Sequence, residues 1–100
     1  MVRRQTELRL ASINSTKMLV INSNETLYTL SSGNRALEIT NRGTQILLYG
    51  QSSVIVNSGG LIYGGGSKFW DSVTGDFTLY LAINSIGVTT NVSAQEYGGN

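Results

Sequence analysis

Three residue types that carry much of protein chemistry are absent from this chain of 100 residues, which contains no cysteine, no histidine and no proline. Without cysteine the chain can form neither a disulfide nor a thiolate metal site. Without histidine or cysteine it can build neither a Ser-His-Asp triad nor a Cys-His pair. We therefore expect a protein that is not an enzyme and has no catalytic residue, cofactor or metal ion. Extra stability for so small a domain must come from packing or from assembly into an oligomer.

The missing proline also bears on any β-sheet that the chain forms. Proline is one of the common means by which proteins protect the edge strands of a sheet from pairing with other chains. Because this means is not available here, the edges must be covered by charge, by β-bulges or by a neighbouring subunit.

Charge is scarce and nearly balanced, with seven Lys and Arg against six Asp and Glu, which gives a formal net charge of +1. Nucleic-acid binders concentrate basic residues on one face, so we expect no nucleic-acid partner. No apolar run approaches the ~20 residues of a membrane span, and no signal-peptide pattern opens the chain. We expect a soluble, unsecreted protein without a membrane partner, although the absence of cysteine only fits a reducing compartment and does not establish one.

The one basic stretch is at the N-terminus, where Arg3, Arg4 and Arg9 are offset by Glu7. Two interpretations are open for this segment. It is either an arm that grips a partner and becomes ordered on docking, or a tail that stays disordered. We treat residues 1–10 as a basic N-terminal arm, 11–97 as a single domain and 98–100 as a flexible tail.

The residues that are abundant, Ser, Thr, Asn and Gly, favour strands and turns over helix interiors. No window shows the spacing of an amphipathic helix, whereas short apolar stretches alternate with turn signals at intervals of about 8–12 residues. This pattern predicts an all-β antiparallel β-sandwich, Ig-like or jelly-roll-like, of about eight or nine short strands.

Two local expectations follow from the same pattern. The segment Gly33–Gly50 reads as a strand, a turn at Asn41-Arg42-Gly43 and a second strand, which predicts a β-hairpin. The run Lys17–Asn22 contains four consecutive apolar residues and predicts a strand that is buried on both sides. Shorter strands are expected at Leu8–Leu10 and Val54–Val56.

The aromatic residues allow two interpretations. Tyr63, Trp70 and Tyr80 could form a platform for a sugar ring or for a protein partner, which makes Tyr63 and Trp70 candidate partner-binding residues alongside the arginines of the arm. Alternatively, Trp70 is the main aromatic residue of the core, because the chain has a single Trp and few other large side chains.

The C-terminal two-thirds of the chain shows a distinctive order of strands and turns. Asn34–Gly43 has the form N-R-x-L-x-I-x-N-x-G, and Ile46–Gly50 follows with a Leu-Tyr-Gly ending. The later segments are a glycine turn at Gly64–Gly66, an aromatic stretch at Phe69–Asp71, a Thr74-Gly75 turn, an alternating strand at Phe77–Ala82 and a closing strand at Asn91–Tyr97. This order resembles that of small virion proteins of tailed bacteriophages, although the usual Pro before the glycine turn is missing.

The resemblance implies a structural virion protein, and in particular a capsid decoration (cement) protein. It implies a location on the capsid surface after synthesis in the host cytoplasm, the major capsid protein as partner, and a homo-oligomer, either a trimer or a dimer. Two other classes stay open, namely a glycan-binding module of a fibre or adhesin and a self-assembling tail or fibre subunit.

Overall fold

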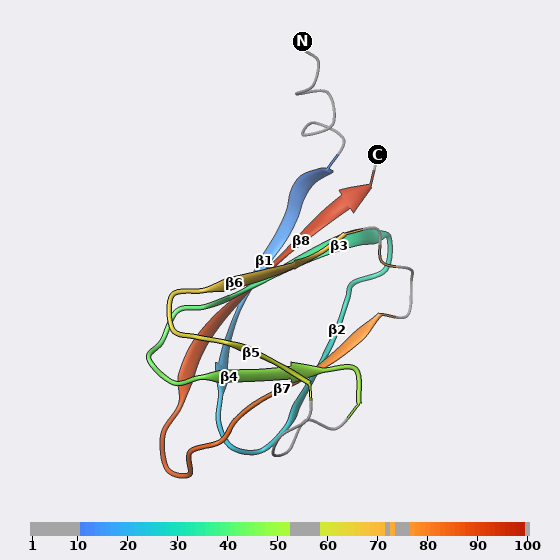
Figure 1. Ribbon diagram of the computed structural model, residues 1–100. Helices are drawn as coiled ribbons and strands as arrows, with labels where there is room; N and C mark the ends of the chain where they lie inside the picture. Colours follow the sequence, from blue (N-terminus) through green and yellow to red (C-terminus); the bar gives the residue numbers. More distant parts are fainter. Residues whose placement is uncertain (1–10, 53–58, 72, 74–76, 100) are drawn as a thin grey trace.

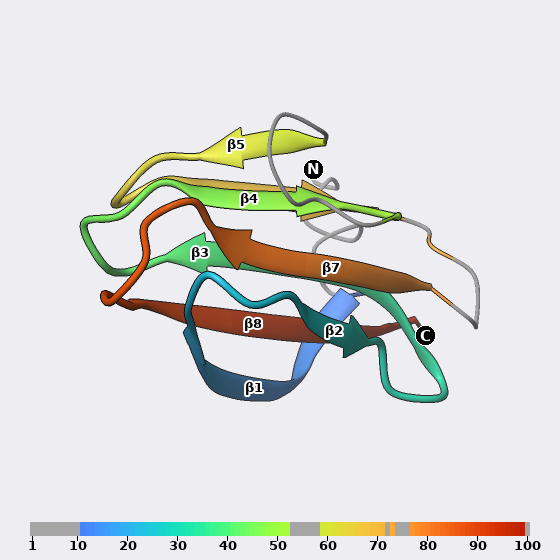
Figure 2. The same cartoon turned by 90° about the horizontal axis from the view of Figure 1, so that it is seen from below.

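The computed structural model describes residues 11–52, 59–71, 73 and 77–99, which form eight β-strands and no helix. The strands are β1 (Ala11–Ile21), β2 (Thr26–Thr29), β3 (Asn34–Asn41), β4 (Leu47–Gly50), β5 (Gly60–Ile62), β6 (Ser67–Trp70), β7 (Thr78–Ile83) and β8 (Thr90–Gly99). They make two four-stranded antiparallel sheets, with the strand orders β1-β8-β3-β6 and β2-β7-β4-β5, which lie as two layers (Figures 1 and 2). The predicted all-β sandwich is confirmed.

The strand order identifies the type of sandwich. Strand β1 pairs with β8, β2 with β7, β3 with β6 and β4 with β5. The pairs are those of one long hairpin whose two arms, β1–β4 and β5–β8, are wound together across the two sheets. That arrangement is the jelly roll. Of the two sandwich types that the sequence left open, the structure therefore shows the jelly roll and not the Ig-like fold.

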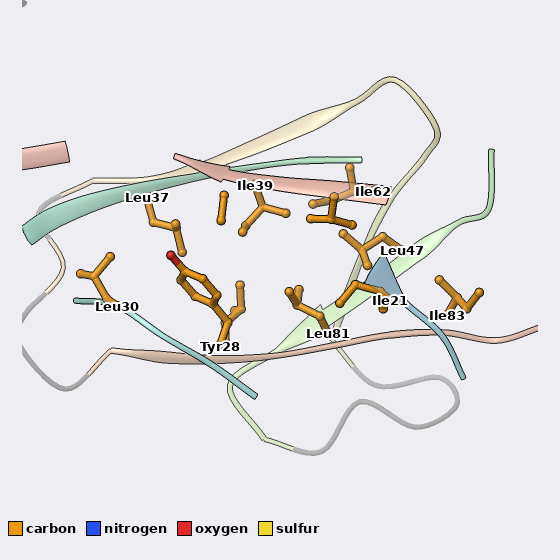
Figure 3. Packing of buried hydrophobic residues seen from close by; sticks show 12 residues of the cluster. Ile21, Tyr28, Leu30, Leu37, Ile39, Leu47, Ile62, Leu81 and Ile83 are labelled. Carbon is orange, nitrogen blue, oxygen red and sulfur yellow. The ribbon is translucent and has the colours of Figure 1, made fainter. Parts of the chain in front are cut away.

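One core fills the space between the sheets (Figure 3). Alternate residues of each strand point inward, so that Leu37 and Ile39 of β3 are buried in the same cluster as Leu79 and Leu81 of β7. The other buried members are Ile21, Tyr28, Leu30, Leu47, Ile62, Ile83, Val92 and Ala94. Burial of a complete Leu or Ile side chain contributes about 1.5–3 kcal/mol, so this cluster supplies most of the stability of the domain.

The expected hairpin at Gly33–Gly50 is wrong. Strands β3 and β4 belong to different sheets, and the chain crosses from one layer to the other between Asn41 and Leu47. The crossing is held by the side chain of Asn41, which is fully buried and donates to the carbonyl oxygen of Gln45 instead of standing at the tip of a tight turn.

The strand at Lys17–Asn22 is not buried on both sides, because only one face of its sheet packs on the core. Ile21 faces the core, whereas Met18 and Val20 point outward with exposed fractions of 64% and 67%. Beyond Tyr97, where a tail was expected, β8 continues to Gly99 and pairs with Ala11 of β1. The strands expected at Leu8–Leu10 and Val54–Val56 lie outside the described residues.

Candidate functional site

Two buried polar side chains anchor the loops at opposite ends of the sandwich. Glu96 of β8 lies near the end where β1 begins and β8 ends, and Asn41 of β3 lies near the other end. Neither side chain has any surface exposed to solvent. Buried polar groups of this kind are costly unless they are fully hydrogen-bonded, so their partners decide what each one does.

Four groups surround the Glu96 carboxylate. The Tyr28 hydroxyl donates to Oε2, the Asn34 side-chain amide donates to Oε1 at 2.6 Å, and the Ser31 backbone N–H donates to Oε1 at 3.1 Å. Lys17 Nζ lies 3.2 Å from Oε2, donates to Ser31 Oγ at 3.0 Å and stands over the Tyr28 ring. This cluster ties β1, β2 and β8 to the β2–β3 loop.

The hydrogen bonds determine the protonation of the cluster. Burial by itself would raise the pKa of Glu96, but the bonds from Tyr28, Asn34, Ser31 and Lys17 outweigh it and lower the pKa from 4.5 to about 2. Burial, followed by the hydrogen bond and charge of Glu96, raises the pKa of Tyr28 above its ordinary value of 10. At neutral pH the cluster therefore holds a carboxylate and a neutral phenol.

The Glu96 cluster is built for structure and not for chemistry. Both carboxylate oxygens already accept hydrogen bonds, and the side chain is enclosed on every side. Over the described ranges, no group of three or more His, Cys, Asp or Glu side chains could hold a metal ion. The part of the chain that the structure describes also has no helix long and apolar enough to cross a membrane.

Asn41 uses all of its side-chain bonding groups to connect three loops. Its Nδ2 donates to the carbonyl oxygens of Gln45 at 2.6 Å and Ile62 at 2.9 Å. Its Oδ1 accepts from Thr90 Oγ1 at 2.7 Å and from the Gly43 backbone N–H at 3.1 Å. The backbone of Asn41 adds two further bonds to the β5–β6 loop, one with Gly65 and one with Gly66.

The crossing of the chain is packed closely around this residue. A Cβ atom at Gly43 would lie 2.1 Å from Thr90 Oγ1, and one at Gly64 would lie 2.5 Å from the Gly43 carbonyl oxygen. Only glycine allows the β3–β4 loop to approach the β5–β6 loop and Thr90, the first residue of β8, this closely. The hydrogen bonds of Asn41 and these close contacts therefore hold the two loops together.

We define the loop end as these two loops together with the β7–β8 loop at the same end of the sandwich, that is, residues 42–46, 63–66 and 84–89 (left in Figures 1 and 2). Large apolar side chains stand out from each of its loops: Ile46 is 43% exposed, Tyr63 63%, Ile86 90% and Val88 40%. Arg42 is the one charged residue in these segments, and its Nε donates to Ser93 Oγ at 2.9 Å. A surface that exposes several large apolar side chains and one charged residue is a candidate protein-interaction site.

The structure separates the aromatic residues that the sequence suggested as a platform. Tyr63 is exposed at the loop end, whereas Trp70 packs against the core, with ring centroids 5.3 Å from Tyr49 and 6.0 Å from Phe77. Tyr80 lies against Leu48 and Ala82 on the opposite side of its sheet. Trp70 and Tyr80 therefore do not share one platform. Trp70 is half-buried and packs against the core, whose buried aromatic residue among the described residues is Tyr28. A partner-binding role for Tyr63 and Trp70 stays a prediction. Arg3, Arg4 and Arg9 lie outside the described residues.

Sequence reasoning missed the two buried polar residues, although a signal for each was present. Asn41 is two residues beyond Ile39 and four beyond Leu37, which places it on the inner face of β3. Glu96 likewise shares the inner face of β8 with Val92 and Ala94. A polar residue at a position that continues the apolar face of a strand is therefore expected to be buried and hydrogen-bonded.

Comparisons of the chain with protein-family models, with curated proteins and with solved structures found no match. The class of the protein is thus defined by its own structure, as a small jelly-roll domain with an apolar loop end.

Proposed function

We propose that this chain is a structural virion protein of a tailed bacteriophage, most specifically a capsid decoration protein that docks through its loop end onto the major capsid protein. The observation that carries the proposal is the loop end, from which Ile46, Tyr63, Ile86 and Val88 stand exposed. The order of strands and turns from Asn34 to Tyr97 supports the virion assignment, and the jelly roll is a recurrent architecture of capsid proteins.

The mechanism is adhesion by burial. Ile46, Tyr63 and Ile86 bury apolar surface when the loop end enters a recess between capsid subunits, and each buried aliphatic side chain contributes about 1.5–3 kcal/mol. Because Asn41 holds the β3–β4 and β5–β6 loops in place before docking, these two loops lose little conformational entropy on binding. Several copies bound around a capsid would then resist separation of the subunits to which they attach.

Two measurements test the proposal separately. Mass spectrometry of purified virions from the bacteriophage that encodes the chain should find it in fixed stoichiometry with the major capsid protein. Absence from the virion would contradict the function itself, whatever the role of the loop end.

The docking surface is tested by co-sedimentation with heads that lack the chain. Ile86→Asp should bind at least tenfold more weakly, because a carboxylate must be buried where an apolar side chain was. Leu27→Asp is the matched control, since Leu27 is 53% exposed on β2 and lies outside the loop end. Equal loss in both variants, or no loss in Ile86→Asp, would exclude the loop end as the contact.

A further inference from the structure

The four edge strands of the two sheets differ greatly in length. Strands β2, β5 and β6 have four, three and four residues, whereas β1 has eleven. An edge strand exposes a row of unpaired N–H and C=O groups, and proteins limit this hazard by keeping edge strands short or by guarding them with proline, charge or bulges. Strand β1 alone is long enough to pair with another strand over several residues.

Few of these protective features are present on β1, so most of its edge is free to pair. A register shift at Ile13/Ser15 distorts its first part, but Ser15–Ile21 pairs regularly with β8, which is its only neighbour among the described strands. Lys17 is the one charged residue in this stretch, and it is turned inward and paired with Glu96. Met18 and Val20 stand exposed on the outer face.

We propose that two copies of this chain associate by pairing β1 with β1 of the second copy, antiparallel and about a two-fold axis at Met18. The two β1-β8-β3-β6 sheets then form one continuous eight-stranded sheet. A two-fold contact of this kind uses the same surface on both copies and closes on itself, so the assembly stops at a dimer.

The register is chosen so that as many residues as possible of the regular stretch Ser15–Ile21 can pair. With Met18 opposite Met18 of the second copy, all seven residues of Ser15–Ile21 find a partner, and Thr16 lies opposite Val20. Moving the axis to Leu19 would pair only five residues within β1. The chosen register also sets Lys17 opposite Leu19, so the two lysines are not direct cross-strand neighbours, which would be unfavourable.

A second copy fits this edge better than an unrelated partner does. The outward side chains are uncharged and mutually compatible, so that like surfaces meet without repulsion. Seven residues from each copy make an interface smaller than the ~1,200–2,000 Å² of standard complexes, and we expect association at micromolar concentrations. The pairing does not depend on the proposed function, because the residues of the loop end take no part in it.

Cysteine cross-linking tests both the contact and its register. The chain has no cysteine, so any disulfide in a single-cysteine variant must join two copies. Facing residues of antiparallel strands have Cα atoms about 4.5–5.5 Å apart, within the range that a disulfide requires. Met18→Cys should therefore cross-link at least tenfold faster than Leu27→Cys, the control on a short edge strand with comparable exposure.

Sedimentation equilibrium supplies the independent measurement. The unchanged chain should approach twice the monomer mass at about 100 μM, and Met18→Lys should weaken the dimer at least tenfold, because it brings two ammonium groups together at the axis. Circular dichroism should be unchanged in Met18→Lys, since Met18 is exposed in the monomer. The proposal is overturned by a monomer at that concentration, by a ladder of species beyond the dimer, or by equal cross-linking of the two cysteine variants.

Discussion

Replacing Glu96 with glutamine removes one buried charge near the end of the sandwich where β1 begins and hardly changes the size of the side chain. The glutamine Oε1 can still accept from Ser31 and Asn34, but its amide N–H groups face Lys17 and cannot replace the ion pair. Tyr28 and Lys17 consequently lose their anionic partner while the rest of the core stays in place.

The size of the effect follows from the pKa of Glu96. A pKa lowered from 4.5 to about 2 means that the folded state prefers the carboxylate over the carboxylic acid by about 3 kcal/mol. Since the folded-state pKa lies below the unfolded one, this stabilisation is complete above pH 4.5 and is lost as the pH falls toward 2. Glu96→Gln should be less stable than the unchanged chain by about 3 kcal/mol at pH 7, and this difference should shrink to near zero by about pH 2.

Urea unfolding measured at about pH 7, 5, 3.5 and 2.5 follows this difference directly. The single Trp70, packed against Tyr49 and Phe77, provides the fluorescence signal. Glu38→Gln is the matched control, because Glu38 is half-buried on the outer side of β3 and accepts a long, 3.4 Å bond from Tyr97. A difference for Glu96→Gln that is the same at pH 7 and pH 2.5 would refute the role assigned to its charge.

Two further outcomes are expected. Burial, with the hydrogen bond and charge of Glu96, raises the pKa of Tyr28, so above about pH 10 the unfolded chain loses the phenol proton more readily than the folded chain and the fold loses stability. Tyr28→Phe lacks the hydrogen bond to Glu96 and should be less stable at pH 8, but it should lose less stability between pH 9 and pH 11 in the same urea assay. Parallel alkaline curves would contradict this. Asn41→Ala should lower the free energy of unfolding by more than about 2 kcal/mol in thermal or urea unfolding, because it leaves the Gly43 N–H and the Thr90 hydroxyl without their acceptor. Asn91→Ala, at an exposed position, should lower it by less than about 0.5 kcal/mol.

The sandwich could be predicted because its signals are local. Turn residues recur at short intervals, and alternation in Phe77–Ile83 places Leu79 and Leu81 on one face, as the structure shows. The layer to which each strand belongs is a different matter. Strands β3 and β4 have the sequence of a hairpin, and only the long-range bonds of Asn41 to Ile62 and Thr90 show why the chain crosses between sheets there.

The loop end was predictable only in part. Tyr63 stood out as an aromatic residue beside a glycine turn, but Ile46, Ile86 and Val88 resemble ordinary strand residues in the sequence. Their exposure depends on where the three crossings end in space, which is a property of the whole topology. The open side of β1 was hidden for the same reason, since an apolar run at a sheet edge and one at its centre read alike.

The pairing of the first described strand with the last one affects when the protein can fold. Ile21 pairs with Thr90 and Ala11 with Gly99, so β1 has no partner until nearly the whole domain has been synthesised. At about 5–20 residues per second, β1 waits roughly 4–16 s on the ribosome with its apolar residues uncovered. Slow, late closure is common in folds dominated by distant contacts. Protection of β1 during translation, by a chaperone or by the ribosome surface, would therefore govern the yield of folded protein.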